Sequence, residues 1–411
     1  MTLIRTHALR SIATAALIGL LAPSAAAQSA EIAFVDGRKS KGLIVRADPE
    51  VAVIRTGSTE SRVPTRHLVS AWTGRRAAAV SPDPFNIYLN GGDRLRGKVE
   101  GDGEKLAFQS DAIKGLTVPL YRATAVCLGT FFGQVQTNYR DLFFKQQAGG
   151  RDSIIVNRGS KPFSFRAAVQ EIRKDALVVR MGDEQRELAR DKVYGFTHTA
   201  AADAAQPTGV LVRVHLLDGG RITLPLKSIT AETIHAGGAS IARAQVARLE
   251  FVGDHIDHLS AMQPVAFDAV SLFGKAPRWR ADGMVFGGPL KLGGRVYQRG
   301  IGVQAQARLE YAVGRRWGQL LLVCGIDDAA SREGEATFRV IGDGKVLREV
   351  KHRRGEEPIV LRLDISGVDR LVLEALPGAS YTSDLCDWAE ARVFNDVGTL
   401  PDAERKQPDD K

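Results

Sequence analysis

Hydrophobic and polar residues alternate along most of the chain in short segments separated by glycine, aspartate and asparagine. In the first half this pattern repeats four times, and each copy opens with an alternating segment that ends in an Asp-Gly or Asn-Gly type of turn. The opening segments are 32–37, 86–92, 153–159 and 212–220. Period-2 alternation buries one face of a sheet. Each copy is therefore predicted to be a curled antiparallel sheet of four or five strands.

The four copies have a period of roughly 40–60 residues. The predicted repeats are 31–76, 84–128, 151–198 and 209–253. A connecting segment, 129–150, separates the second repeat from the third, and an alanine-rich linker, 199–208, precedes the fourth. Units of this size hold only a small core, so neighbouring copies are expected to pack together. In pattern they resemble small Sm-like or SH3-like barrels.

The first 27 residues have the composition of a signal peptide. Arg5 and Arg10 precede an apolar run that ends at Ala22, and the sequence Ala-Ala-Ala at 25–27 provides a cleavage pattern. The run is shorter than the ~20 residues that span a bilayer. An exported bacterial protein is expected, in the periplasm, in the cell envelope or outside the cell; an uncleaved anchor is the alternative.

From 254 to 396 the pattern changes, and a charged tail, 397–411, follows. About six alternating segments lie between Val303 and Val393, without a long helical period, which is typical of a β-sandwich. The most specific stretch is Gly287-Gly-Pro-Leu-Lys-Leu-Gly-Gly-Arg-Val-Tyr-Gln-Arg-Gly-Ile-Gly-Val-Gln-Ala305. Four further motifs follow it in order: 325–328, 338–345, 363–368 and 384–391.

These five motifs, in this order, resemble the NPCBM/NEW2 family of carbohydrate-binding modules. The resemblance covers about one third of the chain. It implies a galactose-binding-like jelly-roll β-sandwich whose loops at one end hold a glycan. The whole chain is thus expected to be all-β, with tandem small antiparallel barrel or meander repeats followed by this sandwich.

Sugar recognition needs flat aromatic faces and polar groups that pair with hydroxyls. The candidate carbohydrate-binding residues are Trp279, Tyr297, Gln304, Asp327, Asp328, Tyr381, Asp384, Asp387 and Trp388. The strand-like surroundings of Trp388 favour a core position, whereas Trp279 and Tyr381 lie in predicted loops. Where the family commonly has two histidines, this chain has Gln304 and Leu385; of these, only Gln304 can hydrogen-bond a hydroxyl.

Other residue groups leave two interpretations each. The carboxylates of Asp327, Asp328, Asp384 and Asp387 could hold a structural Ca²⁺ or could cap turns. In an oxidising compartment Cys324 and Cys386 could form a disulfide, and the alternative is that all three cysteines are buried thiols. The segment 254–258, Asp-His-Ile-Asp-His, could bind a metal, but an exposed linker is favoured. No cofactor is required.

Catalytic signatures are absent from the sequence: it has no G-x-S-x-G, H-E-x-x-H, Walker or dinucleotide-binding motif. The chain has 411 residues and a net charge of +9. Residues 28–253 carry 32 basic and 23 acidic side chains, whereas 254–396 carry 19 and 20. The basic residues of the repeats are scattered, which argues against a nucleic-acid groove. An anionic envelope polymer or an acidic protein is the expected partner of the repeats.

The function predicted from these observations is that of an exported, non-catalytic carbohydrate-binding protein. The sandwich would contact a glycan or polysaccharide, and the repeats would act as a spacer or docking module. One alternative is a structural or protein-interaction envelope protein whose sandwich has lost sugar binding. A second alternative is an enzyme associated with glycoside hydrolysis.

Overall fold

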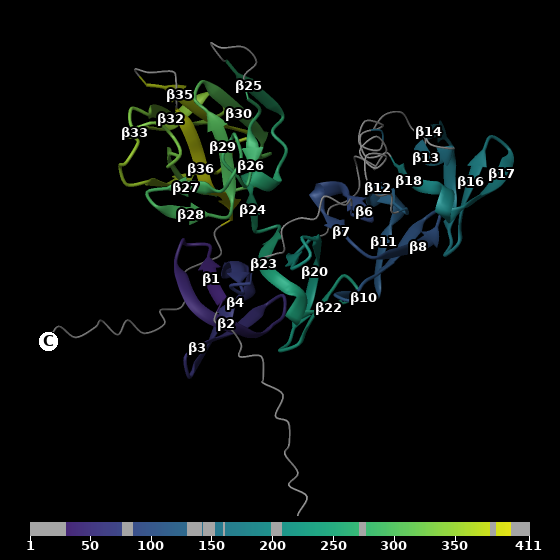
Figure 1. Ribbon diagram of the computed structural model, residues 1–411. Helices are drawn as coiled ribbons and strands as arrows, with labels where there is room; N and C mark the ends of the chain where they lie inside the picture. Colours follow the sequence, from purple (N-terminus) through teal and green to yellow (C-terminus); the bar gives the residue numbers. More distant parts are fainter. Residues whose placement is uncertain are drawn as a thin grey trace, which may run out of the picture.

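The computed structural model describes residues 30–75, 85–129, 142, 153–158, 161–198, 208–270, 277–378 and 384–395. Within these ranges strands and single-turn 3-10 helices make up almost all regular structure, and every strand pairing is antiparallel. The predicted all-β class, with small repeated sheets followed by a sandwich, is confirmed (Figure 1). The predicted signal peptide and charged tail lie outside the described residues. In the part of the chain that is described, no helix is long and apolar enough to cross a membrane.

The strands of the first half form four groups of similar order. The first group is β1 (Ala30–Phe34), β2 (Lys39–Ala47), β3 (Val51–Thr56), β4 (Thr59–Pro64), η1 (Thr65–His67) and β5 (Leu68–Trp72). The second is β6 (Ile87–Leu89), η2 (Asn90–Gly92), β7 (Arg94–Leu95), β8 (Lys98–Asp102), β9 (Lys105–Gln109), β10 (Ile113–Lys114), β11 (Leu116–Pro119), η3 (Leu120–Arg122) and β12 (Ala123–Cys127). The third is β13 (Ser153–Arg158), β14 (Lys161–Arg166), β15 (Ala168–Ile172), β16 (Ala176–Met181), β17 (Glu184–Ala189), η4 (Arg190–Lys192) and β18 (Val193–Thr197). The fourth is β19 (Val210–Leu216), β20 (Arg221–Ile229), β21 (Thr233–Ala236), β22 (Ala239–Ala242), η5 (Arg243–Gln245) and β23 (Val246–Gly253).

A shared detail shows that the four groups are copies of one unit. In each, a single 3-10 turn precedes the closing strand. The backbone N–H of the first residue of this turn donates to a carbonyl in the preceding hairpin. The four bonds are Thr65 N to Glu50 O, Leu120 N to Glu104 O, Arg190 N to Asp175 O and Arg243 N to Glu232 O. This bond ties the start of each 3-10 turn to the preceding hairpin.

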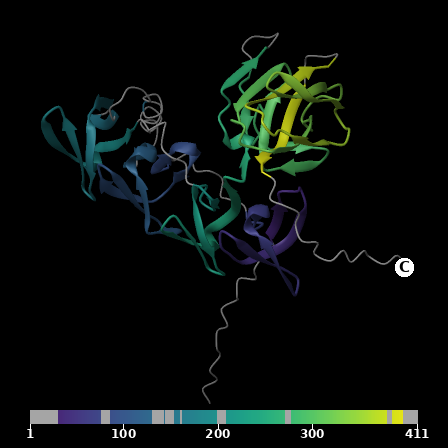
Figure 2. The same cartoon turned by 180° about the vertical axis from the view of Figure 1, so that it is seen from behind.

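The repeats pair in a nested order rather than in sequence. The closing strand β5 of the first pairs with β23 of the fourth, and β12 of the second pairs with β18 of the third. Strands β7 and β10 of the second repeat then pair with β20 and β22 of the fourth. In space the order is first, fourth, second, third, as both views show (Figures 1 and 2). One continuous apolar core runs from Ile32 to Phe251 through all four.

The sandwich begins two residues after β23. Its strands are β24 (Ile256–His258), β25 (Ala266–Ala269), β26 (Arg280–Ala281), β27 (Leu290–Leu292), β28 (Arg295–Tyr297), β29 (Gly300–Gln304), β30 (Ala307–Ala312), β31 (Gln319–Ile326), β32 (Glu335–Gly342), β33 (Lys345–Arg353), β34 (Ile359–Asp364), β35 (Arg370–Pro377) and β36 (Leu385–Phe394), with η6 (Leu259–Ala261) after β24. One sheet has the order β26-β29-β36-β31-β34, the other β25-β30-β35-β32-β33, and β27 and β28 form a separate hairpin. Their facing apolar side chains form a second core.

An apolar contact seats the sandwich on the first repeat. Ala33, Val35 and Val69 of that repeat pack with Ile256, Leu321 and Phe394 of the sandwich as one buried cluster. The sandwich end that carries the last residues of β36 therefore faces the repeats. Its opposite end, where β29 and β31 finish and β36 begins, lies far from this contact.

We expect Gly302→Ala, in the glycine-rich motif, to destabilise the sandwich by about 1–3 kcal/mol, the usual cost of overpacking. A Cβ on this buried residue would lie against the Gly283 carbonyl oxygen and 2.7 Å from the Val285 amide nitrogen. Gly318→Ala is the control, since its Cβ would meet nothing closer than the Ser366 hydroxyl at 3.7 Å. Urea denaturation of both variants checks this; equal destabilisation would contradict it.

Candidate functional site

Three of the predicted sugar-binding residues lie at the end of the sandwich that faces away from the repeats. Trp279 immediately precedes β26, Gln304 ends β29, and Asp328 follows β31 by two residues. These strands are neighbours in one sheet, in the order β26-β29-β36-β31. All three side chains are partly exposed. An aromatic face, an amide and a carboxylate at one end of a sheet can together stack on a sugar ring and pair its hydroxyls.

The two positions that depart from the family pattern are direct partners. Gln304 lies opposite Leu385 in the ladder between β29 and β36. Directly opposed residues have adjacent side chains. The chain therefore lacks both expected imidazoles at one place, and an amide next to an apolar side chain stands there. Tyr381, the other predicted loop aromatic, lies outside the described residues.

Two predicted aromatic platforms are corrected by the structure. Trp388 is fully buried and packs edge-to-face on Phe338, with 5.0 Å between ring centroids. Tyr297 is also buried, with Leu290 and Leu292 beneath the β27–β28 hairpin. Both side chains belong to apolar clusters because they alternate inward on strands that form the sheet and the hairpin. Neither can stack on a sugar in this structure.

The predicted carboxylates are mostly interior groups as well. Asp327 accepts backbone hydrogen bonds from Lys291 and Ala329, and Asp328 accepts them from Gly293 and Gly294. These two side chains thus hold the β27–β28 hairpin against the end of β31. This is the turn-capping alternative for both residues.

Asp387 is fully buried behind Asp327. Burial raises the pKa of Asp387 well above its usual range, and the neighbouring Asp327 carboxylate raises it further. Neither oxygen of Asp387 accepts a well-formed hydrogen bond from a described donor. Burial and Asp327 thus favour the protonated form of Asp387, and its position in the interior excludes it as an exposed sugar ligand.

The fourth carboxylate, Asp384, is also buried and accepts a hydrogen bond from the Glu335 amide. Burial raises its pKa. Among the described residues no group of three or more His, Cys, Asp or Glu is arranged to hold a metal ion. The structural Ca²⁺ stays a prediction without geometric support.

The three cysteines are buried free thiols, which is the second of the two interpretations and excludes the possible Cys324–Cys386 disulfide in this structure. In the ladder between β31 and β36, Cys324 lies opposite Trp388 and Cys386 lies opposite Ile326. The two cysteines are therefore diagonal neighbours, ~7–8 Å apart between Cα atoms in a regular sheet, beyond the usual disulfide range. Burial raises the pKa of Cys324 and of Cys127 to about 12, so neither is a reactive thiolate.

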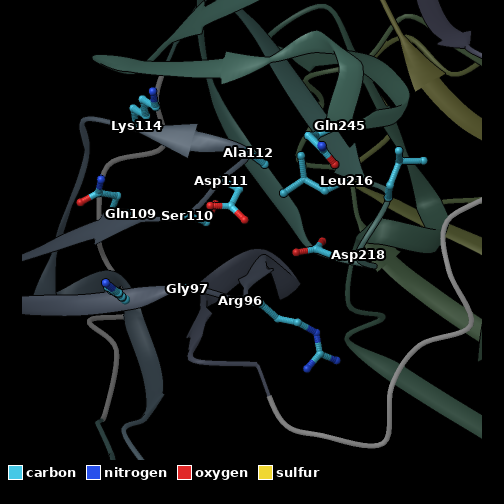
Figure 3. A pocket seen from close by; sticks show the side chains of 12 residues that line it. Arg96, Gly97, Gln109, Ser110, Asp111, Ala112, Lys114, Leu216, Asp218 and Gln245 are labelled. Carbon is cyan, nitrogen blue, oxygen red and sulfur yellow. The ribbon is translucent and has the colours of Figure 1, made fainter.

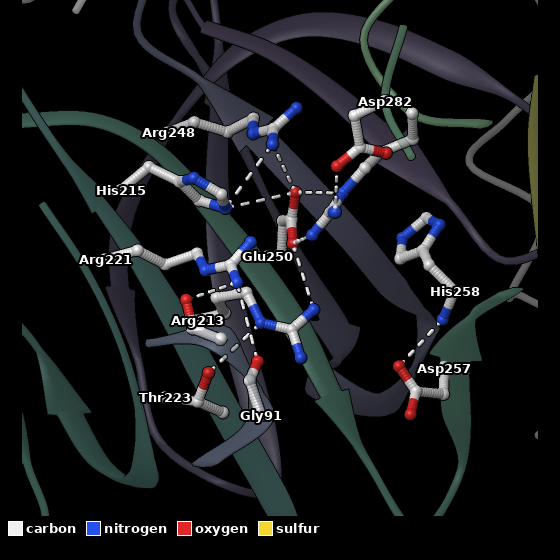
Figure 4. Close-up of polar contacts among 12 residues, drawn as sticks. Gly91, Arg213, His215, Arg221, Thr223, Arg248, Glu250, Asp257, His258 and Asp282 are labelled. Atoms are coloured by element: carbon white, nitrogen blue, oxygen red, sulfur yellow. Dashed lines mark hydrogen bonds and ion pairs between the residues drawn. The ribbon is translucent and has the colours of Figure 1, made fainter. Parts of the chain in front are cut away.

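A buried ionic cluster joins the fourth repeat to the sandwich, and the sequence did not indicate it. Glu250 on β23 forms a bidentate ion pair with Arg299, whose Nε donates to Oε1 at 2.7 Å while Nη2 donates to Oε2. Arg248 contacts the same carboxylate at 2.6 Å, and Asp282 holds the third nitrogen of Arg299 at 2.6 Å. Figure 4 shows Arg213, His215 and Arg248 of the fourth repeat around Glu250, with Asp282 of the sandwich nearby.

Electrostatics keep Glu250 charged despite its full burial. Burial alone would raise the pKa of Glu250, but the charges of Arg299 and Arg248, together with a hydrogen bond from His215, outweigh it and hold that pKa well below its usual range. The same burial lowers the pKa of His215 to about 4, so the imidazole next to Glu250 is neutral at pH 7. The sequence signal for this site is the alternation of Arg213 with His215 and of Arg248 with Glu250 on polar faces of two strands. Sequence does not say what covers such a face.

The segment 254–258 is neither an exposed linker nor a metal site. His255 and His258 are both buried, and β24 pairs with the end of β36. The prediction failed because the chain passes from the repeats into the sandwich without a spacer. Burial lowers the pKa of His255 to about 4.

A concave region lies between the second and fourth repeats and has a volume of about 700 Å³. Figure 3 shows Asp111 and Asp218 near its centre, with Arg96 and Lys114 around them. Asp218 accepts a hydrogen bond from the Gly220 amide of its own turn. Cations and carboxylates are mixed in this groove, so it does not select an anionic polymer.

Comparison with known proteins identifies the class of domain to which the sandwich belongs. With two facing antiparallel sheets and the motif order given above, it is a carbohydrate-binding-module-like β-sandwich. Residues 260–394 match the family described as NPCBM/NEW2 domain, and the resemblance predicted from the motifs is confirmed. The matched region is about one third of the chain.

A curated protein named "Putative endo-alpha-N-acetylgalactosaminidase", from Renibacterium salmoninarum, is 34% identical over 117 residues. The match covers 28% of this chain and 8% of that protein, so the chain spans only a small part of its relative's length.

Among solved structures, the CBM51 module of Clostridium perfringens GH95, in complex with methyl-galactose, is 18% identical and covers 34% of this chain and 99% of its own, with a TM-score of 0.31. The tandem CBM51 modules of a family 98 glycoside hydrolase from Streptococcus pneumoniae are 11% identical and cover 89% and 88%, with a TM-score of 0.32.

We expect Glu250→Gln to lower the free energy of unfolding by about 3–5 kcal/mol, because it leaves buried guanidinium groups without their counter-charge. The control is Glu60→Gln, which removes an exposed ion pair to Arg55 and should cost less than about 1 kcal/mol. Because the pKa of Glu250 is depressed, its contribution is complete above the usual glutamate pKa and is lost as pH falls below it. Calorimetry at several pH values checks this; an acid-side loss of equal size in Glu250→Gln would contradict it.

Asp387→Asn should flatten the dependence of stability on pH. The raised pKa of Asp387 means that its stabilising contribution is fully present below the usual aspartate pKa and is lost as pH rises. The amide keeps a donor toward Asp327 and does not titrate. The free energy of unfolding of the variant at pH 8 should therefore exceed that of the native chain by more than about 1 kcal/mol. Exposed Asp268→Asn should change stability at pH 8 by less than about 0.5 kcal/mol. A variant less stable than the native chain at pH 8 would refute this assignment.

Proposed function

We propose that this chain is an exported, non-catalytic carbohydrate-binding protein that contacts glycans with the far end of its sandwich. The observation that carries the proposal is that Trp279 and Gln304 lie on neighbouring strands, with Asp328 at the same end of that sheet, in an NPCBM/NEW2 domain. The opposite end is occupied by the repeats, so it cannot serve as an open site. A partly exposed indole and an amide on the neighbouring strand have the chemistry of a sugar platform with a hydroxyl partner.

The repeats, in this proposal, set the position of the sandwich and take no part in chemistry. Their nested pairing with one continuous core makes them a stiff arm rather than a flexible spacer. Their net positive charge favours attachment to an anionic envelope polymer or to an acidic protein. The glycosidase named among the relatives is compatible with this role, since binding modules accompany such enzymes as separate units.

A structural role without sugar binding is the second candidate. The pair formed by Gln304 and Leu385 favours it, because an apolar side chain lies next to Gln304 where the family commonly has an imidazole. Under this alternative the sandwich end would contact protein, not glycan.

The test is a glycan array with the purified full chain, followed by calorimetry on the glycans retained. Trp279→Ala should weaken binding by about tenfold or more, since stacking of an aromatic side chain on a ligand contributes on the order of 1–2 kcal/mol. Gln304→Ala should give a smaller loss. Tyr121→Ala, an exposed aromatic in the second repeat, is the control and should bind as the native chain does.

Absence of any retained glycan, with the melting temperature of the chain intact, would reject the proposal and favour the structural role. Broad glycosidase and esterase assays on the same preparation test the enzymatic alternative.

A further inference from the structure

The first and fourth repeats share a sheet face that neither could form alone. Trp72 of β5 lies opposite Glu31 of β1 and, on its other side, opposite Arg248 of β23. Directly paired residues point to the same face of a sheet. Their three side chains therefore form a row across the joint between the two repeats. A second row runs beside it: Ala33, Ser70, Glu250 and Arg213.

The sandwich covers only part of this face. Arg299 closes on Glu250 in the second row, and a cavity of about 340 Å³ remains beside it. Three units supply its walls: Trp72 belongs to the first repeat, Arg248 to the fourth, and Gln298 to the sandwich. A volume of this size lies within the range of small-ligand sites.

Two guanidinium groups in this cavity have hydrogen-bond donors to spare. Arg248 uses Nη2 for both Glu250 and His215, and its remaining nitrogens have no acceptor among the described residues. Arg295 is exposed on the β28 strand and has no acidic partner in the described part of the chain. Three carboxylates line the cavity, and each already has a cationic partner: Glu31 pairs with Lys39, Glu250 with Arg299 and Glu390 with Arg392. Guanidinium N–H groups that have no acceptor are suited, by their planar geometry, to bind a carboxylate.

The lining also includes an aromatic ring and an imidazole. Trp72 is half-buried and offers apolar surface. His258 also lines the cavity, is 1% exposed, and has no hydrogen-bond partner at either ring nitrogen. Figure 4 shows its imidazole turned toward the side on which Glu250 and Asp282 lie. Burial and the neighbouring Arg299 hold the pKa of His258 well below its usual range, so the neutral ring can pair with a hydroxyl.

We propose that this cavity is a second binding site, which takes a carboxylate-bearing sugar residue. The sugar ring packs on Trp72, its carboxylate is held by Arg248 and Arg295, and a hydroxyl pairs with His258. The site requires both halves of the chain, because its aromatic wall comes from the repeats and one of its two cations from the sandwich. It does not depend on the proposed glycan site at the far end.

Short oligogalacturonates and their methyl esters test this site, since the pair differs only in the carboxylate. Calorimetry with the full chain should detect the acid, with at least about tenfold weaker binding of the ester, as expected for charge-assisted hydrogen bonds. Added salt should weaken binding of the acid. Equal affinity for acid and ester, or no binding of either, would overturn the proposal.

Variants locate the binding. Arg295→Gln, at an exposed residue without an ion pair, should weaken binding of the acid about fivefold to tenfold while leaving the melting temperature unchanged. Trp72→Ala should have a similar effect, and if it does not fold, Gln298→Ala replaces it. Arg348→Gln, an exposed arginine on β33, is the matched control and should bind normally.

Trp279→Ala separates this site from the proposed glycan site. It should leave binding of oligogalacturonate unchanged. Loss of acid binding in Trp279→Ala but not in Arg295→Gln would place the acid at the far end of the sandwich and refute the second site.

Discussion

The arrangement of the whole molecule depends on one carboxylate, that of Glu250. It lies on the closing strand of the last repeat and is surrounded by arginines from both halves, Arg213 and Arg248 from the repeats and Arg299 from the sandwich, with the neutral imidazole of His215 beside them. A buried ion pair gains little over an apolar contact in stability, but breaking it is costly. Its effect is therefore to specify one orientation of the sandwich, while the apolar cluster around Phe394 contributes the burial.

That orientation decides which end of the sandwich can bind a ligand. Arg299 and Asp282 occupy the end that meets the repeats, so the end with Trp279 and Gln304 remains open. The same docking leaves a gap along the joint between the first and fourth repeats. Both proposed sites thus result from the interface between the sandwich and the repeats. The glycan site is open because it lies away from this interface, and the second site exists because the interface does not fill the joint between the repeats.

The sequence allowed much of the fold to be predicted, because local patterns determined it. Alternation and Asp-Gly turns indicated the repeated sheets, and the ordered glycine motifs indicated the sandwich. Pairing between repeats could not be predicted, since β5 meets β23 through residues such as Ala71 and Leu249 that look like any other strand residues.

The candidate sugar site was only partly predictable for the same reason. Trp388, Tyr297 and Asp387 carry suitable chemistry, but burial removes them from any surface, and burial depends on tertiary packing. Glu250 and Arg299 were missed because the pairing of two distant charges has no local signature. The position of Gln304 next to Leu385, in contrast, was implicit in two motif departures and needed only the strand register to connect them.

The nested order of the repeats has a consequence for how the chain folds. Strand β5 is complete at Trp72, yet its partner β23 begins only at Val246. Until that distant segment arrives, the first repeat exposes an unpaired strand edge and part of its core, and such edges are templates for association between chains. Closing so long a loop is slow, and contacts of high sequence separation delay folding. The first repeat to be synthesised is thus among the last to be completed, and the chain depends on protection of that edge in the meantime.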